Sequence, residues 1–169
     1  MKTLFVLLIL VTFQINQVTG QTFDGVEVSG NYIDVVKKFK AKDFKESYEG
    51  DNSIVLDGKT LNKNISLVIA YTPKTKQAYQ FTIIFEKETS QLVLKKEFDN
   101  FVELFTEKYG QPVKNESNET YKYFSIWNKV TYYISLAVTE KDNIMIGYHN
   151  TVNSEICKKE KKELEKETF

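Results

Sequence analysis

The feature that most constrains the fold is a long amphipathic segment in the second half of the chain, from about Ser90 to Tyr109. Gly110 suits a left-handed C-terminal stop, and Pro112 prevents the helix from continuing. Because a helix with one apolar stripe must bury that stripe, the segment requires a second layer to pack against. The stripe recurs at i, i+4, i+7, i+8, i+11 and i+15 and consists of Leu94, Phe98, Phe101, Val102, Phe105 and Tyr109.

Segments that alternate apolar and polar side chains stand on both sides of this helix and predict that the second layer is an antiparallel sheet. Strands are expected before the helix over 53–56, 65–72 and 79–86, and after it over 120–127, 130–139 and 143–150. The Asp57-Gly58 dipeptide predicts a two-residue hairpin turn after the first of these strands, because glycine accepts positive φ.

An earlier helix is predicted over about 31–42, where Asn31 is a suitable N-cap. Each half of the chain therefore pairs one amphipathic helix with about three strands. We expect a single α+β domain over 21–152, with an antiparallel sheet of about six to seven strands in two meanders and the two helices on one face. The pattern indicates a doubled helix-plus-meander unit.

Residues 1–20 are expected to be a signal peptide that is cleaved after Gly20. Lys2 precedes an uncharged run from Leu4 to Thr12 that is too short to span a bilayer, and Val18-Thr19-Gly20 suits a signal peptidase. No later stretch approaches the length of a spanning helix. We therefore expect an exported protein, periplasmic or extracellular, with no membrane span.

The charge balance argues against nucleic acid as a partner. The chain has 23 basic and 23 acidic residues, whereas nucleic acids and anionic membranes attract a positive field. One histidine, His149, and one cysteine, Cys157, cannot supply the usual zinc spacings, and neither a nucleophile elbow nor a phosphate loop is present. No metal, no cofactor and no catalytic residue is therefore assigned.

Two short segments resemble known proteins. The run FTEKYGQP at Phe105–Pro112 and the strand IMIGYHN at Ile144–Asn150 resemble uncharacterised small secreted proteins of Bacteroidetes-type bacteria. The doubled helix-plus-meander pattern is also similar to the β-lactamase-inhibitor-protein-like fold. The resemblance implies an exported α+β domain and transfers no active residue to this chain.

The last three strands predict an aromatic sheet face. If Phe124 and Ile126 face the core, alternation puts a set of Tyr, Trp, Met and His side chains on the other side. The residues that we expect to bind are Tyr121, Tyr123, Trp127, Tyr133, Met145 and His149. Such side chains combine a large contact area with polar tips, so we hypothesise a surface for a protein, a peptide or a glycan.

Other interpretations stay open at this point. Tyr and Trp are also good strand formers, and the charged tail over 153–169, which is either helical or frayed and has almost nothing to bury, could lie over them. A small hydrolase-type enzyme could use carboxylates and His149, and a Cys157–His149 pair is a further option for nucleophilic chemistry. A structural cell-envelope protein would need no small ligand.

Overall fold

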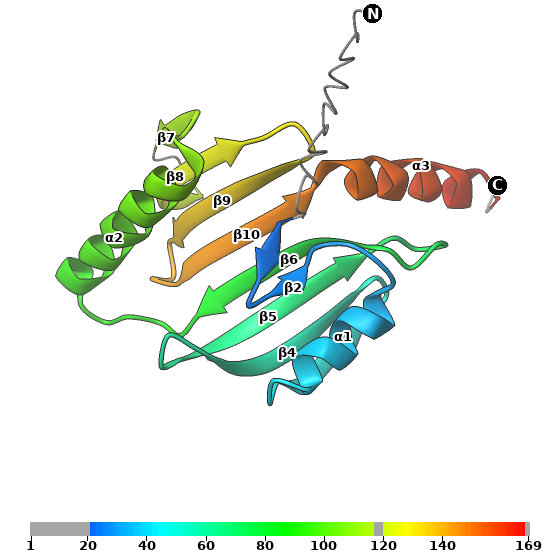
Figure 1. Cartoon of the computed structure of the whole chain (residues 1–169), viewed down its shortest axis with the longest axis horizontal. Coiled ribbons are helices and arrows are strands. Elements are labelled where there is room, and N and C mark those ends of the chain that lie inside the picture. Colours follow the sequence, from blue (N-terminus) through cyan, green and yellow to red (C-terminus); the bar gives the residue numbers. More distant parts are fainter. Residues whose placement is uncertain (1–20, 117–119, 168–169) are drawn as a thin grey trace, which may run out of the picture.

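The computed structural model describes residues 21–116 and 120–167, the side chains of 115 and 116 excepted. The predicted signal peptide, 1–20, lies outside the described residues. The described part contains a small hairpin, two strand meanders and three helices (Figure 1). The first half consists of β1 (Thr22–Phe23), β2 (Val26–Glu27), α1 (Tyr32–Lys40), β3 (Lys45–Gly50), β4 (Ser53–Thr60), β5 (Lys63–Tyr71) and β6 (Ala78–Phe85). The second half consists of α2 (Gln91–Tyr109), β7 (Lys114–Glu116), β8 (Tyr121–Asn128), β9 (Tyr132–Thr139), β10 (Ile144–Asn150) and α3 (Thr151–Glu167).

The strands β3 to β10 form one antiparallel sheet of eight strands in the order β3-β4-β5-β6-β10-β9-β8-β7. Each half is a helix followed by a four-stranded meander, and the last strands of the two meanders, β6 and β10, pair antiparallel in the middle. The predicted α+β class and antiparallel sheet are confirmed. Each meander has one strand more than predicted, because the edge strands β3 and β7 are short and polar and carry no alternating pattern.

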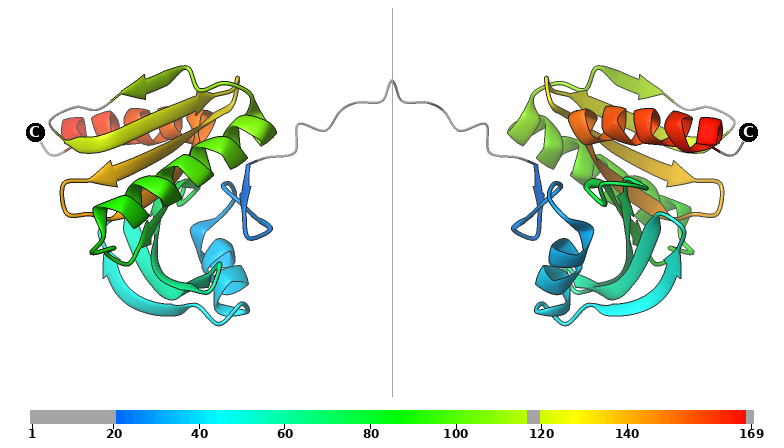
Figure 2. Two further views of the ribbon diagram at one scale, coloured as in Figure 1. Left: turned by 90° about the vertical axis from the view of Figure 1, so that its left-hand side faces the viewer. Right: turned by 90° about the vertical axis from the view of Figure 1, so that its right-hand side faces the viewer.

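Both amphipathic helices cover the same face of the sheet, which we call the helix-covered face (Figures 1 and 2). The register aligns Phe81, Tyr148, Ile134 and Trp127 in one row across β6, β10, β9 and β8. Phe39 of α1 packs edge-to-face on Phe81 at one end of this row. At the other end, Phe105 of α2 packs edge-to-face on Trp127, with ring centroids 5.3 Å apart.

Local interactions define both ends of α2, and the predicted C-terminal stop at Gly110 is confirmed. The Ser90 side chain accepts a hydrogen bond from the backbone N–H of Val93, so it caps the N-terminus. Gly110 ends the helix with a φ of 83°, a conformation that glycine adopts without strain. The predicted boundaries of this helix therefore agree with the structure within one residue.

The hairpin turn predicted at Asp57-Gly58 is wrong. The strand β4 runs through both residues, and the turn to β5 lies at Leu61 and Asn62, which have φ of 50° and 61°. Gly58 serves close packing instead, because a Cβ at this position would lie 2.5 Å from Cδ1 of Phe44. The glycine was therefore a correct signal for an unusual backbone environment and a wrong one for a turn.

The C-terminal segment is helical, and the expectation that it has nothing to bury is wrong. Cys157 and Glu160 of α3 are only 4% and 6% exposed. The Glu160 carboxylate accepts hydrogen bonds from the backbone N–H of Lys74 at 2.7 Å and from the hydroxyl of Thr75 at 2.6 Å. α3 is thereby joined to the loop between β5 and β6, on the side of the sheet away from α1 and α2 (Figure 2). In the described part of the chain, no helix combines the length and hydropathy that crossing a membrane requires.

Candidate functional site

The face of the sheet opposite α1 and α2 carries apolar side chains in two rows. In one row, Ile84, Met145, Ala137 and Phe124 are aligned across β6, β10, β9 and β8. In the next row, Val55 and Val68 lie at one end and Ile126 at the other, with the small residues Thr82, Gly147 and Ser135 between them. We call the larger apolar side chains of these rows the open face: Val55, Val68, Ile84, Phe124, Ile126 and Met145.

The open face is half-buried rather than covered. All six of its side chains have intermediate exposure, whereas their neighbours on the helix-covered face, such as Leu67 and Leu136, are fully buried. α3 lies over only one end of this side of the sheet, where it contacts β6, β9 and β10. Apolar side chains are therefore accessible across β4, β5, β6, β8 and β10, which is the composition of a contact surface.

Four of the six predicted binding residues lie on this side of the sheet. Met145 belongs to the open face, and Tyr121 stacks on Phe124 with ring centroids 5.3 Å apart. Tyr133 and His149 lie in a third row, beside the start of α3. The expectation that Phe124 and Ile126 face the core is wrong, because both lie on the open face. Ile84, Val68 and Val55 were missed, because the prediction considered only the second meander.

Tyr123 and Trp127 lie on the helix-covered face, so their predicted placement is wrong. Trp127 is 1% exposed, and Tyr123 packs on Phe98 of α2. The strand β8 carries large side chains on both faces, so alternation alone could not decide which face is the core. A register shift between Tyr121 and Tyr123 also places these two tyrosines on opposite faces, although they are two residues apart.

His149 occupies an enclosed position in the third row. Its ring stacks on that of Tyr133 with centroids 4.0 Å apart, and its Nε2 lies 3.2 Å from Oγ of Ser135. The contact with Ser135 exists because Gly147, which lies between them, has no side chain: a Cβ there would overlap both Ser135 Oγ and His149 Nε2. Burial lowers the pKa of His149 to about 4, so the imidazole is neutral at neutral pH.

A cavity of about 310 Å³ lies between this row and α3. Its lining includes His149, Tyr133, Tyr79, Cys157, Lys158 and Lys161. Burial and the neighbouring Cys157 raise the pKa of Tyr79 to about 12. The hydrolase alternative gains little here, because no carboxylate in the described part of the chain contacts the His149 ring to orient it, and an imidazole with so low a pKa is a weak base.

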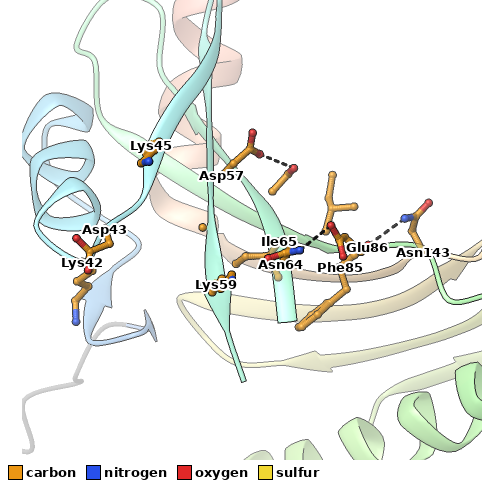
Figure 3. A pocket seen from close by; sticks show the side chains of 13 residues that line it. Lys42, Asp43, Lys45, Asp57, Lys59, Asn64, Ile65, Phe85, Glu86 and Asn143 are labelled. Carbon is orange, nitrogen blue, oxygen red and sulfur yellow. Dashed lines mark hydrogen bonds between the residues drawn. The ribbon is translucent and has the colours of Figure 1, made fainter. Parts of the chain in front are cut away.

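A wide hollow of about 1040 Å³ lies near the ends of β4, β5 and β6 (Figure 3). Two pairs of its polar side chains form hydrogen bonds with each other. Asp57 accepts a hydrogen bond from Ser66 at 2.7 Å, and Glu86 accepts one from Asn64 at 2.9 Å. The hollow is wide and carries charges of both signs, and it borders the open face at Ile84. We therefore regard it as the rim of that face rather than as a separate ligand site.

The charges around the open face are unevenly matched. Asp142 forms an ion pair with Lys122 at 2.6 Å, whereas Asp57 and Glu86 accept hydrogen bonds from the neutral side chains of Ser66 and Asn64, which leave their charge in place. Hydrogen bonds from Lys122 and Gln91 hold the pKa of Asp142 below its usual value. Lysines that form no ion pair with another described residue remain at both ends of this side of the sheet, namely Lys45, Lys59 and Lys161. Charges of both signs are therefore available to a partner beside the hollow, where Lys45 and Lys59 lie near Asp57 and Glu86.

No group of three or more His, Cys, Asp or Glu side chains within the described ranges is arranged to hold a metal ion. Comparisons of the chain with protein-family models, with curated proteins and with solved structures gave no significant match.

Proposed function

We propose that this chain is an exported binding protein that docks a partner protein on the open face of its sheet. The observation that carries the proposal is the pair of apolar rows that crosses the sheet on the side away from α1 and α2. A sheet that served only to complete a core would have polar side chains on its second face. Met145, Ile84 and Phe124 instead supply apolar and adaptable contact area.

The shape of the surface favours a folded protein over a peptide or a glycan. Together the rows extend from β4 to β8, across six of the eight strands, whereas a glycan needs only a few stacked aromatic rings, and Tyr121 and Phe124 stack on each other. An extended peptide would add to an edge strand. The edge strand β3 is unsuited to this, because it contains a register shift between Glu46 and Tyr48 and is exposed and charged.

The chemistry of the partner follows from the charges. The lysines Lys45, Lys59 and Lys161 form no ion pair with another described residue and lie at the two ends of the open face, so we expect carboxylates of the partner opposite them and apolar side chains between. His149 contributes no charge at neutral pH, because burial lowers its pKa to about 4.

The experiment is site-directed photo-cross-linking with extract from the cells that produce the protein. A photoreactive residue replaces either Met145 on the open face or Leu92, which is 82% exposed on α2 and serves as a matched position away from it. We expect a cross-linked protein from position 145 and not from position 92. Ile84→Glu should abolish the product, and Leu92→Glu should leave it unchanged.

Three results would overturn the proposal. They are identical products from both positions, a position-145 product that survives Ile84→Glu, and a product that contains only two copies of this chain. Circular dichroism of each variant shows whether the fold is retained.

A further inference from the structure

The side chain of Gln21 is buried without a partner. The residue is 7% exposed, and both polar atoms of its side-chain amide, Oε1 and Nε2, lack a hydrogen bond within the described part of the chain. A buried primary amide without partners is costly, and native structures contain few of them. The backbone at this residue is nevertheless fixed, because its carbonyl accepts a hydrogen bond from the N–H of Val28 at 2.9 Å.

Gln21 is also the residue that cleavage after Gly20 would make the first of the mature chain. Cleavage creates an α-ammonium group on this residue, in addition to the unpartnered amide. The cavity beside Gln21 is lined mainly by neutral residues, among them Gln77, Asn150 and Asn153, and its one acid, Glu27, is exposed. A free N-terminal glutamine would therefore place a charge and several unmatched N–H donors in a poorly compensating environment.

We propose that Gln21 is a modification site at which the mature N-terminus cyclises to pyroglutamate. The uncharged α-amine attacks the side-chain carbonyl carbon, a C–N bond forms, the carbon–amide nitrogen bond breaks, and ammonia leaves. No oxidant or reductant is required. The product is a neutral five-membered lactam with a single N–H donor, so the reaction removes both the terminal charge and the primary amide. The inference rests on the cleavage that the proposed export requires, and it is independent of the open face.

The test is mass spectrometry of the full chain, 1–169, produced with its leader in an exporting bacterium. The intact mature protein and its tryptic N-terminal peptide, which ends at Lys37, are measured. We expect a mass that begins at Gln21 and is lower by one ammonia, a peptide that resists Edman degradation, and release of its first residue by pyroglutamyl peptidase.

The matched control is Gln21→Asn. It keeps a primary amide at the N-terminus, but its ring would have four members and does not form, so no ammonia should be lost. A mature wild-type chain that begins at Gln21 with an intact amide and a free amine would overturn the inference while leaving export standing. Cleavage at another residue would likewise overturn the inference alone, whereas a retained leader would overturn both the inference and the proposed export.

Discussion

The imidazole of His149 lies between the ring of Tyr133 and the hydroxyl of Ser135, and cross-strand register determines both contacts. Tyr133 is directly opposite His149, whereas Ser135 is opposite Gly147 and reaches the imidazole diagonally. His149 is the one histidine of the sequence and so the obvious pH-sensitive group, but this position encloses it and keeps it neutral. Two predictions follow from this local geometry.

The first concerns pH. His149 has a folded pKa of about 4, below the ordinary value of 6.5, so the unfolded chain binds a proton that the folded chain does not between these pH values. The stabilisation that depends on a neutral His149 is fully present in the free energy of unfolding above about pH 6.5 and is lost as the pH falls to about 4. The full loss is on the order of 3 kcal/mol. Urea unfolding of wild type and His149→Phe at several pH values measures it.

The phenylalanine variant keeps a ring for Tyr133 to stack on and removes the titrating group. The difference in unfolding free energy between the two proteins should therefore shift in favour of the variant as the pH falls from 6.5 to 4. If the unfolding free energies of the two proteins changed with pH in parallel, the imidazole would be shown to bind protons equally in the folded and unfolded states.

The second prediction concerns Gly147. A methyl group at this position would overlap Ser135 Oγ and His149 Nε2, so Gly147→Ala should destabilise the fold by about 1–3 kcal/mol. Adding Ser135→Gly removes one of the two obstructing groups, so the cost of the alanine should fall in the double variant. Urea midpoints of the four proteins of this cycle provide the measurement. Additive effects would contradict the crowding.

At the scale of elements, the sequence predicts an element best where its signals agree with one another. The helix α2 carries an apolar stripe and a stop at Gly110, and both appear in the structure. The strand β8 carries large side chains on both faces, so only its contact with α2, a long-range feature, decides that Trp127 is buried. For the same reason Phe124 and Ile126 were assigned to the wrong face. The half of the candidate site in β4 to β6 was missed because isolated Val and Ile residues look like ordinary strand residues.

The helix α3 was the element least accessible to sequence reasoning. Its composition is that of a solvated helix, and only Cys157 and Glu160 are buried. Its attachment depends instead on polar contacts with a loop that lies far away in the sequence. Glu160 binds the loop residues Lys74 and Thr75, and Lys74 forms ion pairs with Glu163 and Glu167 of α3. No periodicity in the helix itself reports such contacts.

The third prediction tests this attachment. Burial raises the pKa of Glu160, but the hydrogen bonds from Thr75 and Lys74 outweigh burial and leave the pKa below its usual value. The stabilisation is therefore present above the unfolded pKa and is lost as the pH falls through the folded one. Glu160→Gln should weaken the attachment by about 1.5–3 kcal/mol, the range for hydrogen bonds to a charged group.

Hydrogen exchange of α3 measures this effect, and exchange over 151–167 should accelerate in Glu160→Gln while β9 and β10 stay protected. The control is Glu165→Gln, which removes an exposed carboxylate with no partner among the described residues of the same helix. Equal exchange in the two variants would mean that α3 is held by other contacts.

At the scale of the whole molecule, the doubled order of elements explains why one face of the sheet stays open. An antiparallel strand pair has a local two-fold axis perpendicular to the sheet, and β6 and β10 are such a pair at its centre. A rotation about this axis exchanges the two halves of the molecule but does not exchange the two faces of the sheet. The helices α1 and α2 therefore both cover the same face. The only helix of the described chain on the other side, α3, follows the second meander and has no counterpart after the first.

The fourth prediction follows from the charge distribution over this open side. If lysines steer the partner, its association rate should fall as salt rises, because exposed charges are screened over about 8–10 Å at physiological ionic strength. Combining Lys45→Glu with Lys59→Glu should lower the association rate by about tenfold or more at low salt and change the dissociation rate little. Both rates are measured by stopped flow with the purified partner protein, which the cross-link to position 145 identifies.

The matched control reverses two lysines on the other side of the molecule. Lys37 and Lys38 are exposed on α1, which covers the opposite face of the sheet, so Lys37→Glu with Lys38→Glu changes the net charge equally. If net charge alone governs association, the two double variants should slow it equally. If the open face is the docking surface, only the Lys45 and Lys59 pair should do so, and the difference should vanish at high salt, where the apolar rows act without electrostatic guidance.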